Sequence, residues 1–157
     1  MNLLKFCKDL YPIQRSITGK GLRQTLEYIQ EYIPIKIKEV RSGTKIFDWI
    51  VPPEWNINKA YVQNLDTGEK IIDFKNHNLH VVGYSSPINK VMTLSELDDR
   101  LFSLPERPNA IPYITSYYSR TWGFCLDHNT RISLKPGSYR AFIDSKFKKG
   151  FLRYGEV

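Results

Sequence analysis

Hydrophobic positions in the first third of the chain follow a helical spacing and then change to a strand spacing. Apolar residues recur three or four positions apart in residues 2–11 and again in residues 19–33, which predicts two amphipathic helices. Thr18 is the predicted N-cap of the second helix. Residues 35–40 alternate apolar and charged side chains, so they predict a half-buried strand, which we expect to form a hairpin with residues 45–51.

The rest of the chain is typical of short strands separated by turns. Residues 60–65 and 70–74 predict a second hairpin, because the four residues between them have turn chemistry. A short helix capped by Thr93 or Ser95 is predicted to run through Phe102. Further strands are predicted at residues 79–85, 114–126, 138–147 and 151–157. Two helices followed by many strands predict an α+β fold, or an α/β domain interrupted by a β insertion.

Charge and hydropathy exclude some classes of partner. The formal net charge is +7, but the basic residues are spread along the chain and form no nucleic-acid-binding motif, so we do not expect a nucleic-acid partner. No apolar run is long enough to span a bilayer, and the first residues show no signal-peptide pattern. We therefore expect a cytoplasmic protein with no membrane association.

The cysteines and histidines do not predict a catalytic or metal site. Cys7 and Cys125 are expected to be free thiols, and no zinc-finger spacing is present. His77 and His80 lie three apart at the start of a predicted strand, where such positions point to opposite faces, so we interpret them as polar residues at a strand edge. A thiolate nucleophile at Cys125 would require a base that reaches its sulfur. We expect local packing for Cys125, and we assign no catalytic or metal-ligating residue.

Two further groups of residues are candidates for binding. Tyr117, Tyr118 and Trp122 could form a stacking surface for a sugar or peptide, or they could fill a β core, which is the preferred interpretation. The motif at residues 15–21, RSITGKG, lies directly before the second helix. It could bind an anion or form a capped tight turn, and the capped turn is favoured because the phosphate-loop pattern is absent.

Several segments together resemble a known family. The stretch LYPIQRSITGKGLRQTLEYI is similar to the opening of a bacterial aminopeptidase-like family related to the zinc exopeptidases. The similarity continues in order through SGTKIFDWIVPPEWNI, NLHVVGYSSPI, LPERPNAIPYITSYY, TWGFCLDH and LRYGE, and so covers nearly the whole chain. Genes of this family often accompany genes of surface-polysaccharide biosynthesis.

The resemblance implies an architecture and a cofactor. Residues 1–51 would supply the N-terminal helices and first strands of a peptidase-like α/β domain, residues 52–137 an inserted β-rich module, and residues 138–157 the return to the peptidase-like domain. The full-length family would hold zinc with His, Asp and Glu side chains. Those segments would lie beyond Val157, so no zinc is expected to be bound by this chain. Arg15 is the candidate residue near the substrate cleft.

The resemblance also implies a function. The chain would be the N-terminal portion of an aminopeptidase-like metallohydrolase, inactive by itself. Its expected partners are a peptide or small-molecule substrate in the full-length form, and either an oligomer or a complementing C-terminal half. The alternative is a stand-alone β-rich module that binds a glycan or a peptide.

Overall fold

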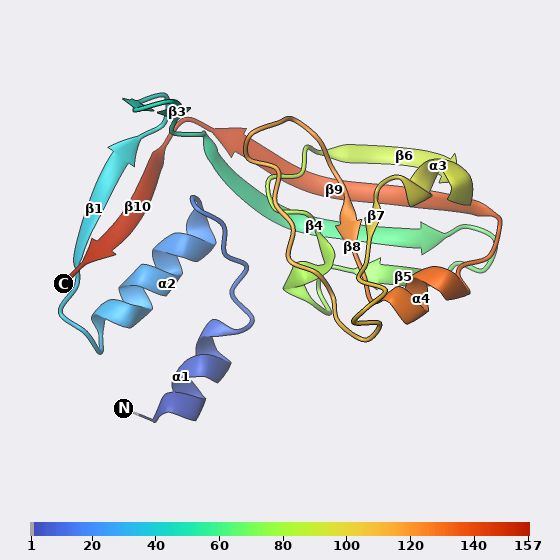
Figure 1. Ribbon diagram of the computed structural model, residues 1–157, viewed down its shortest axis with the longest axis horizontal. Helices are drawn as coiled ribbons and strands as arrows, with labels where there is room; N and C mark the ends of the chain where they lie inside the picture. Colours follow the sequence, from blue (N-terminus) through green and yellow to red (C-terminus); the bar gives the residue numbers. More distant parts are fainter. Residues whose placement is uncertain (1) are drawn as a thin grey trace. The chain divides into compact units, whose positions relative to one another are not determined.

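The structure is a computed structural model that describes residues 2–157. The chain divides into two compact units (Figure 1). The first unit comprises residues 1–56 and 146–157, and the second comprises residues 57–145. The chain therefore leaves the first unit, builds the second, and returns.

The first unit combines two helices with short antiparallel strands. Its elements are α1 (Leu3–Leu10), α2 (Lys20–Gln30), β1 (Lys36–Arg41), β2 (Lys45–Ile46), β3 (Trp49–Ile50) and β10 (Phe151–Glu156). β1 pairs with β10, and β2 pairs with β3. The ring of Phe6 on α1 packs 5.4 Å from the rings of Tyr28 and Tyr32 in the region of α2, so aromatic contacts hold the two helices together.

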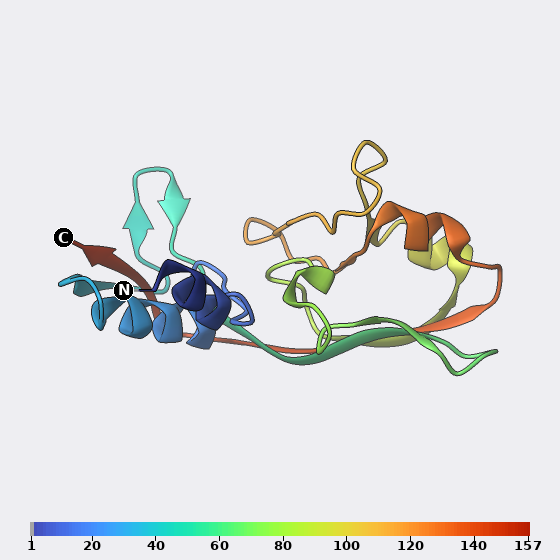
Figure 2. The same ribbon diagram turned by 90° about the horizontal axis from the view of Figure 1, so that it is seen from below.

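The second unit is built on a four-stranded antiparallel sheet. Its strands are β5 (Lys70–Asp73), β4 (Glu54–Asn64), β9 (Ser138–Lys148) and β6 (Ile88–Thr93), in that spatial order, and β4 and β9 each reach three residues into the first unit. The shorter elements are η1 (Asn78–His80), α3 (Leu94–Asp98), β7 (Leu101–Phe102), β8 (Phe124–Cys125) and α4 (His128–Ser133). In Figure 2, α3 and α4 lie on one side of the sheet.

A continuous hydrophobic core lies in the second unit. Alternate residues of β4, β9 and β6 face it, and residues of α3, β7 and β8, with Val81 after η1, close it from the other side. The buried residues of this cluster are Ala60, Val62, Ile72, Val81, Met92, Leu97, Leu101, Phe124, Leu126, Tyr139, Ala141 and Ile143. Helices and antiparallel sheets in one chain confirm the α+β prediction.

The first predicted hairpin is wrong. β1 forms where the alternation predicts it, but it pairs with β10 rather than with residues 45–51. Ser42 N donates to Gly150 O at 2.9 Å, next to the first pair of the β1–β10 ladder. The two strands of this pair therefore come from segments that are far apart in the sequence. Residues 45–50 instead fold on themselves as β2 and β3. The alternating pattern identifies a strand but not its partner.

Two predicted strand segments are also wrong over most of their length. Residues 79–85 form η1 and an irregular segment, in which Tyr84 has a φ of 67°. Of residues 114–126, only Phe124 and Cys125 form a strand. Gly83 connects the two segments, because its N–H donates to Ile114 O and its carbonyl accepts from Ser116 N, both at 2.8 Å. Buried apolar residues in hydrogen-bonded loops have the same composition as strands, which explains the error.

Two elements are present that the sequence interpretation omitted. β6 has the sequence INKVMT, in which Lys90 interrupts the apolar positions Ile88 and Met92, so the alternation that marks a strand is absent. α4 begins at an N-cap, Asp127, whose carboxylate accepts from Thr130 N at 2.8 Å. For α3, the N-cap is Thr93, one of the two predicted candidates, but the helix ends at Asp98 rather than at Phe102.

Candidate functional site

The turn before α2 is a close contact between two backbones. Gly19 has a φ of 91°, and a Cβ there would lie 2.3 Å from Trp55 O; a Cβ on Gly21 would lie 1.7 Å from Gln14 O. Thr18 does not cap α2 as predicted. Its hydroxyl accepts from Trp55 N at 3.2 Å, and Gly19 is the residue at the N-cap position.

The side chain that satisfies the start of α2 comes from the distant strand β4. Asn56 Oδ1 accepts from Lys20 N at 2.8 Å. The glycines of the motif at residues 15–21 therefore serve close packing of the helix start against β4, as the capped-turn interpretation expected. The capping residue could not have been found by local pattern, because it lies 36 positions along the chain.

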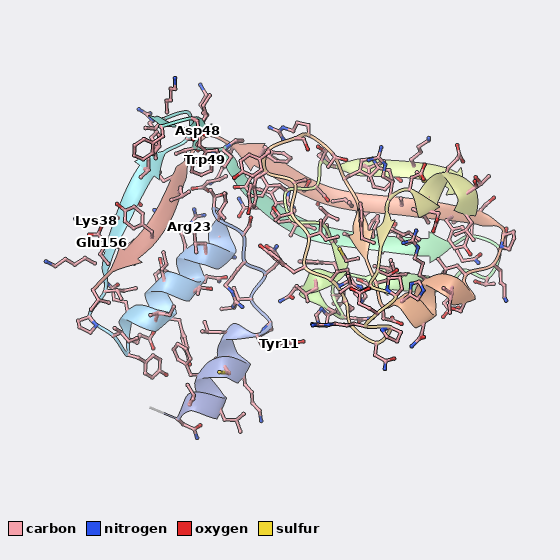
Figure 3. All side chains as sticks on the ribbon, viewed as in Figure 1. Tyr11, Arg23, Lys38, Asp48, Trp49 and Glu156 are labelled. Carbon is pink, nitrogen blue, oxygen red and sulfur yellow. The ribbon has the colours of Figure 1, made fainter. Side chains whose placement is uncertain are left out.

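Next to this contact lies a buried carboxylate with two basic partners. Glu54 is 3% exposed, and its Oε1 accepts from Arg23 Nη1 at 2.8 Å and from Phe151 N at 3.2 Å. Lys148 Nζ lies 3.4 Å from Oε2. A Cβ on Gly150 would lie 2.5 Å from the Glu54 carboxyl, so glycine gives this side chain its space. Figure 3 shows Arg23 on α2.

The surroundings of Glu54 determine its charge. Burial by itself would raise the pKa of Glu54, but the hydrogen bonds from Arg23 and from Phe151 N, with the positive charges of Arg23 and Lys148, hold the pKa below its ordinary value. A carboxylate surrounded in this way is a poor proton acceptor. We interpret Arg23, Glu54 and Lys148 as a structural connection of α2, β4, β9 and β10.

The candidate cleft residue Arg15 contacts the end of α1. Its side chain is exposed, and Nη1 donates to Leu10 O, in the last turn of that helix. This arrangement satisfies a carbonyl at a helix C-terminus, where a positive charge is also favoured by the helix dipole. The role of Arg15 near a substrate cleft stays a prediction.

The three candidate aromatic residues lie in two different sets of contacts. Tyr117 is 5.1 Å from Tyr118 and 5.6 Å from the buried Tyr84, measured between ring centroids. Trp122 instead packs against Phe124 at 6.3 Å, with the Arg100 guanidinium 5.4 Å from its ring. Tyr118 is 81% exposed. Tyr117 and Tyr118 are therefore placed together, whereas the contacts of Trp122 are with the core side of β8.

Cys125 is buried and does not have the properties of a nucleophile. Burial raises the pKa of its thiol to about 12, so the thiol is protonated at neutral pH. The His128 Nδ1 shares a hydrogen bond of 2.9 Å with Ser103 Oγ, and Asp127 caps α4. Cys125 thus packs as a small hydrophobe, and Cys7, the other free thiol, is exposed.

The rings of His77 and His80 lie close together, edge to face, and each ring has its Nδ1 in a hydrogen bond with a backbone group. Their rings are 5.8 Å apart at 71°. His77 Nδ1 accepts from Leu79 N at 3.1 Å, and His80 Nδ1 donates to Cys125 O at 2.8 Å. Burial, and then the charge of His80, lower the pKa of His77.

Within residues 2–157, no group of three His, Cys, Asp or Glu side chains could hold a metal ion. Across the same residues, no helix combines the length and apolar character required to cross a membrane.

Comparison with known proteins identifies the family. The sequence family described as "Domain of unknown function (DUF2172)" matches residues 54–146, which is more than half of the chain. The chain belongs to this family. The matched segment begins at the buried Glu54 and includes the whole second unit, residues 57–145.

Two relatives are longer than this chain. A protein of Clostridium acetobutylicum named "Putative polysaccharide biosynthesis protein with aminopeptidase-like domain" is 52% identical over 149 residues, which are 95% of this chain and 34% of the relative. A crystal structure of a "putative peptidase" from the same organism has a TM-score of 0.91 and 51% identity, covering 98% of this chain and 36% of the other. The chain thus spans about a third of the length of the relatives it matches.

The residues with the clearest structural roles were not predicted. Arg23, Glu54, Asn56 and Lys148 lie in three segments that are separated in sequence, since Glu54 and Asn56 share β4. One signal was available in the sequence: Glu54 is a charged residue between Pro52-Pro53 and Trp55 in an otherwise apolar stretch. A charged residue that is buried in such a stretch requires a partner.

Proposed function

We propose that this chain is the N-terminal portion of an aminopeptidase-like metallohydrolase. The observation that carries the proposal is 52% identity, over 95% of the chain, to a protein whose name includes an aminopeptidase-like domain. The relatives have about two thirds of their length outside the matched region, which provides room for a catalytic centre. The substrate class would be a peptide from which one N-terminal residue is removed.

The proposed architecture is a zinc-exopeptidase-like α/β domain with an inserted β-rich module. Support comes from the course of the chain, because the first unit is discontinuous in sequence and the second unit is continuous. In this proposal the first unit belongs to the peptidase framework and the second unit to the module. The predicted boundaries at residues 51/52 and 137/138 remain a prediction.

The described residues do not fit a zinc site, and we derive no catalytic step from them. The two closest histidines have their Nδ1 atoms in hydrogen bonds with backbone groups, and the buried thiol has a raised pKa. Zinc in the part of the relatives outside this region would polarise a scissile carbonyl and activate water. The contribution proposed for this chain is to complete the fold around that centre.

A chimera tests the proposal. The matching third of the Clostridium relative is replaced by this chain, and zinc content and release of an N-terminal residue from a peptide are measured for the chimera, the parent and the isolated chain. We expect both activity and one zinc per molecule in the parent and chimera. A folded chimera and parent without aminopeptidase turnover would reject the proposal, as would turnover by the isolated chain.

A second candidate function is glycan or peptide binding by the second unit. The observation that favours it is the exposed tyrosine pair, since Tyr118 is 81% exposed beside Tyr117. Titration of the isolated chain with oligosaccharides and peptides tests it, with Tyr118→Ala as the variant and Val91→Ala, at an exposed strand position, as the control. Binding that is lost only in the Tyr118 variant would support this function, and absence of binding would reject it.

A further inference from the structure

The two units differ in how much apolar surface they leave uncovered. Among residues 2–157, ten of the fifteen exposed large hydrophobic side chains belong to the first unit, although it is the smaller one. Only four of the nineteen buried hydrophobic residues belong to it. On α1, Leu3 and Leu4 are about two thirds exposed, and none of the helix residues is buried. Exposed apolar side chains that adjoin one another mark an interaction site, whereas isolated ones do not.

The β1–β10 pair has one covered face and one open face. Ile37, Glu39 and Arg153 face α2, where they line a cavity of about 300 Å³ together with residues of that helix. Side chains alternate along strands, so Val40, Leu152 and Tyr154 point to the other face. Within the first unit, Figure 2 shows the β2–β3 hairpin, and neither α1 nor α2, on that side of the pair.

The open face has the half-buried Val40 and Leu152 at its centre and charged side chains at one end. Val40 lies opposite Leu152, and Lys38 lies opposite Tyr154, which is 42% exposed. Figure 3 shows Lys38 and Glu156 together at the end of the pair, where their charged groups are 4.0 Å apart. A two-stranded sheet is marginal by itself, and an additional strand or a covering apolar segment would stabilise it.

The backbone hydrogen bonds of this sheet show which groups point outward. Ser42 N donates to Gly150 O, so the hydrogen-bonded pairs continue at Val40–Leu152 and Lys38–Tyr154. The residues between them direct their N–H and C=O groups to the outer edges. Phe151 agrees with this alternation, because its N–H donates outward to Glu54. Gly155 on β10, and Ile37 and Glu39 on β1, therefore present outward backbone groups.

The two edges are not equivalent. β1 carries Lys36, Lys38, Glu39 and Arg41 along its six residues, and charged side chains of this kind protect an edge strand against pairing. On β10, the edge is occupied at Leu152 by a bridge to Thr18, and the segment from Arg153 to Glu156 continues beyond it. The edge of β10 is the better acceptor for another strand.

We propose that the open face of the β1–β10 pair and the outer edge of β10 bind the part of the polypeptide that the relatives possess outside the matched region. The occupant supplies a strand that pairs with Gly155 and apolar side chains that cover Val40, Leu152 and Tyr154. The length of the relatives argues for this occupant, since about two thirds of each lies outside the match. The inference rests on the proposed function and names the surface through which this portion joins the rest.

Amide hydrogen exchange on the isolated chain and on the chimera tests this surface. We expect exchange of the Gly155 amide to slow by roughly tenfold or more in the chimera, while the amides of Ile37 and Glu39 remain fast in both. Tyr154→Glu should lower the melting temperature of the chimera and leave that of the isolated chain unchanged. The matched control is Val91→Glu, because Val91 is a strand residue of similar exposure, 48%, and it should have no such selective effect.

Three results would overturn the inference. The first is a folded chimera in which the Gly155 amide exchanges as fast as in the isolated chain. The second is a chimera that aggregates although the parent is soluble. The third is protection of the Gly155 amide in the isolated chain that increases with protein concentration, which would identify a second copy as the occupant. Zinc content and peptidase turnover are measured in parallel. Protection of Gly155 without turnover supports the surface and rejects the proposed function, and turnover without protection does the reverse.

Discussion

Arg23 and Glu54 form a partly buried ion pair in which the guanidinium Nη1 lies 2.8 Å from the carboxylate Oε1. The side chain of Glu54 is 4% exposed, so its charge depends on its protein partners rather than on water. The same carboxylate accepts from the first residue of β10. The pair therefore connects a helix near the start of the chain with a strand near its end.

Removal of one partner should destabilise the protein. We expect Arg23→Met to lower the free energy of unfolding by about 3 kcal/mol, because it leaves Glu54 buried without its main partner. Arg153→Met is the control, since Arg153 pairs with the more exposed Glu39 and should cost about 1 kcal/mol or less. Urea unfolding measures both. Equal effects of the two substitutions would contradict the structural role of Arg23.

The lowered pKa of Glu54 predicts a loss of stability in acid. A carboxyl group with a folded-state pKa below its ordinary value of 4.5 contributes stability above that pH, and the contribution disappears as pH falls through the folded-state value. Melting temperatures of the wild type should therefore decrease more steeply below pH 4.5 than those of Glu54→Gln. Parallel curves for the two proteins would show that Glu54 does not contribute to this pH dependence.

Gly19 and Gly43 allow the cost of a positive φ to be distinguished from the cost of a steric clash. Gly19 and Gly43 have φ values of 91° and 90°, but a Cβ on Gly19 would meet Trp55 O at 2.3 Å, whereas a Cβ on Gly43 has no atom within 4 Å. We expect Gly43→Ala to cost about 1 kcal/mol for the conformation alone. Gly19→Ala should cost roughly 2 kcal/mol more, because a backbone must move. Similar melting temperatures for both variants would refute the close contact.

The two cysteines should differ in reactivity. Cys7 is exposed, whereas Cys125 is buried with a pKa of about 12. We predict that one thiol reacts rapidly with an alkylating reagent at pH 8 and that the second reacts only after unfolding. Mass spectrometry of the peptides identifies the site. Rapid alkylation of Cys125 in the folded protein would contradict its burial.

The fold was predictable where the pattern is local. The spacing of Leu22, Leu26 and Ile29 predicts α2, and the turn at residues 66–69 predicts the β4–β5 hairpin, because each depends on neighbouring residues. The pairing of β1 with β10 was not predictable, since any alternating strand could have been the partner. The aromatic residues 117 and 118 have strand-like composition but lie in a loop held by Gly83.

The site was predictable only in part. The glycine motif at residues 15–21 correctly indicated a tight turn before a helix, and its capping residue, Asn56, comes from another segment. Glu54 was missed because its partners, Arg23 and Lys148, lie far away in sequence. Long-range ion pairs leave no periodic signal in a single sequence.

The central claim is that the zinc site lies in the part of the relatives outside this chain, and zinc stoichiometry tests it most directly. The zinc content of the isolated chain and of the chimera is measured by native mass spectrometry after chelation and re-addition of zinc. Our account predicts one tightly held zinc ion in the chimera and none in the isolated chain. Retention of one zinc ion per isolated chain would contradict it.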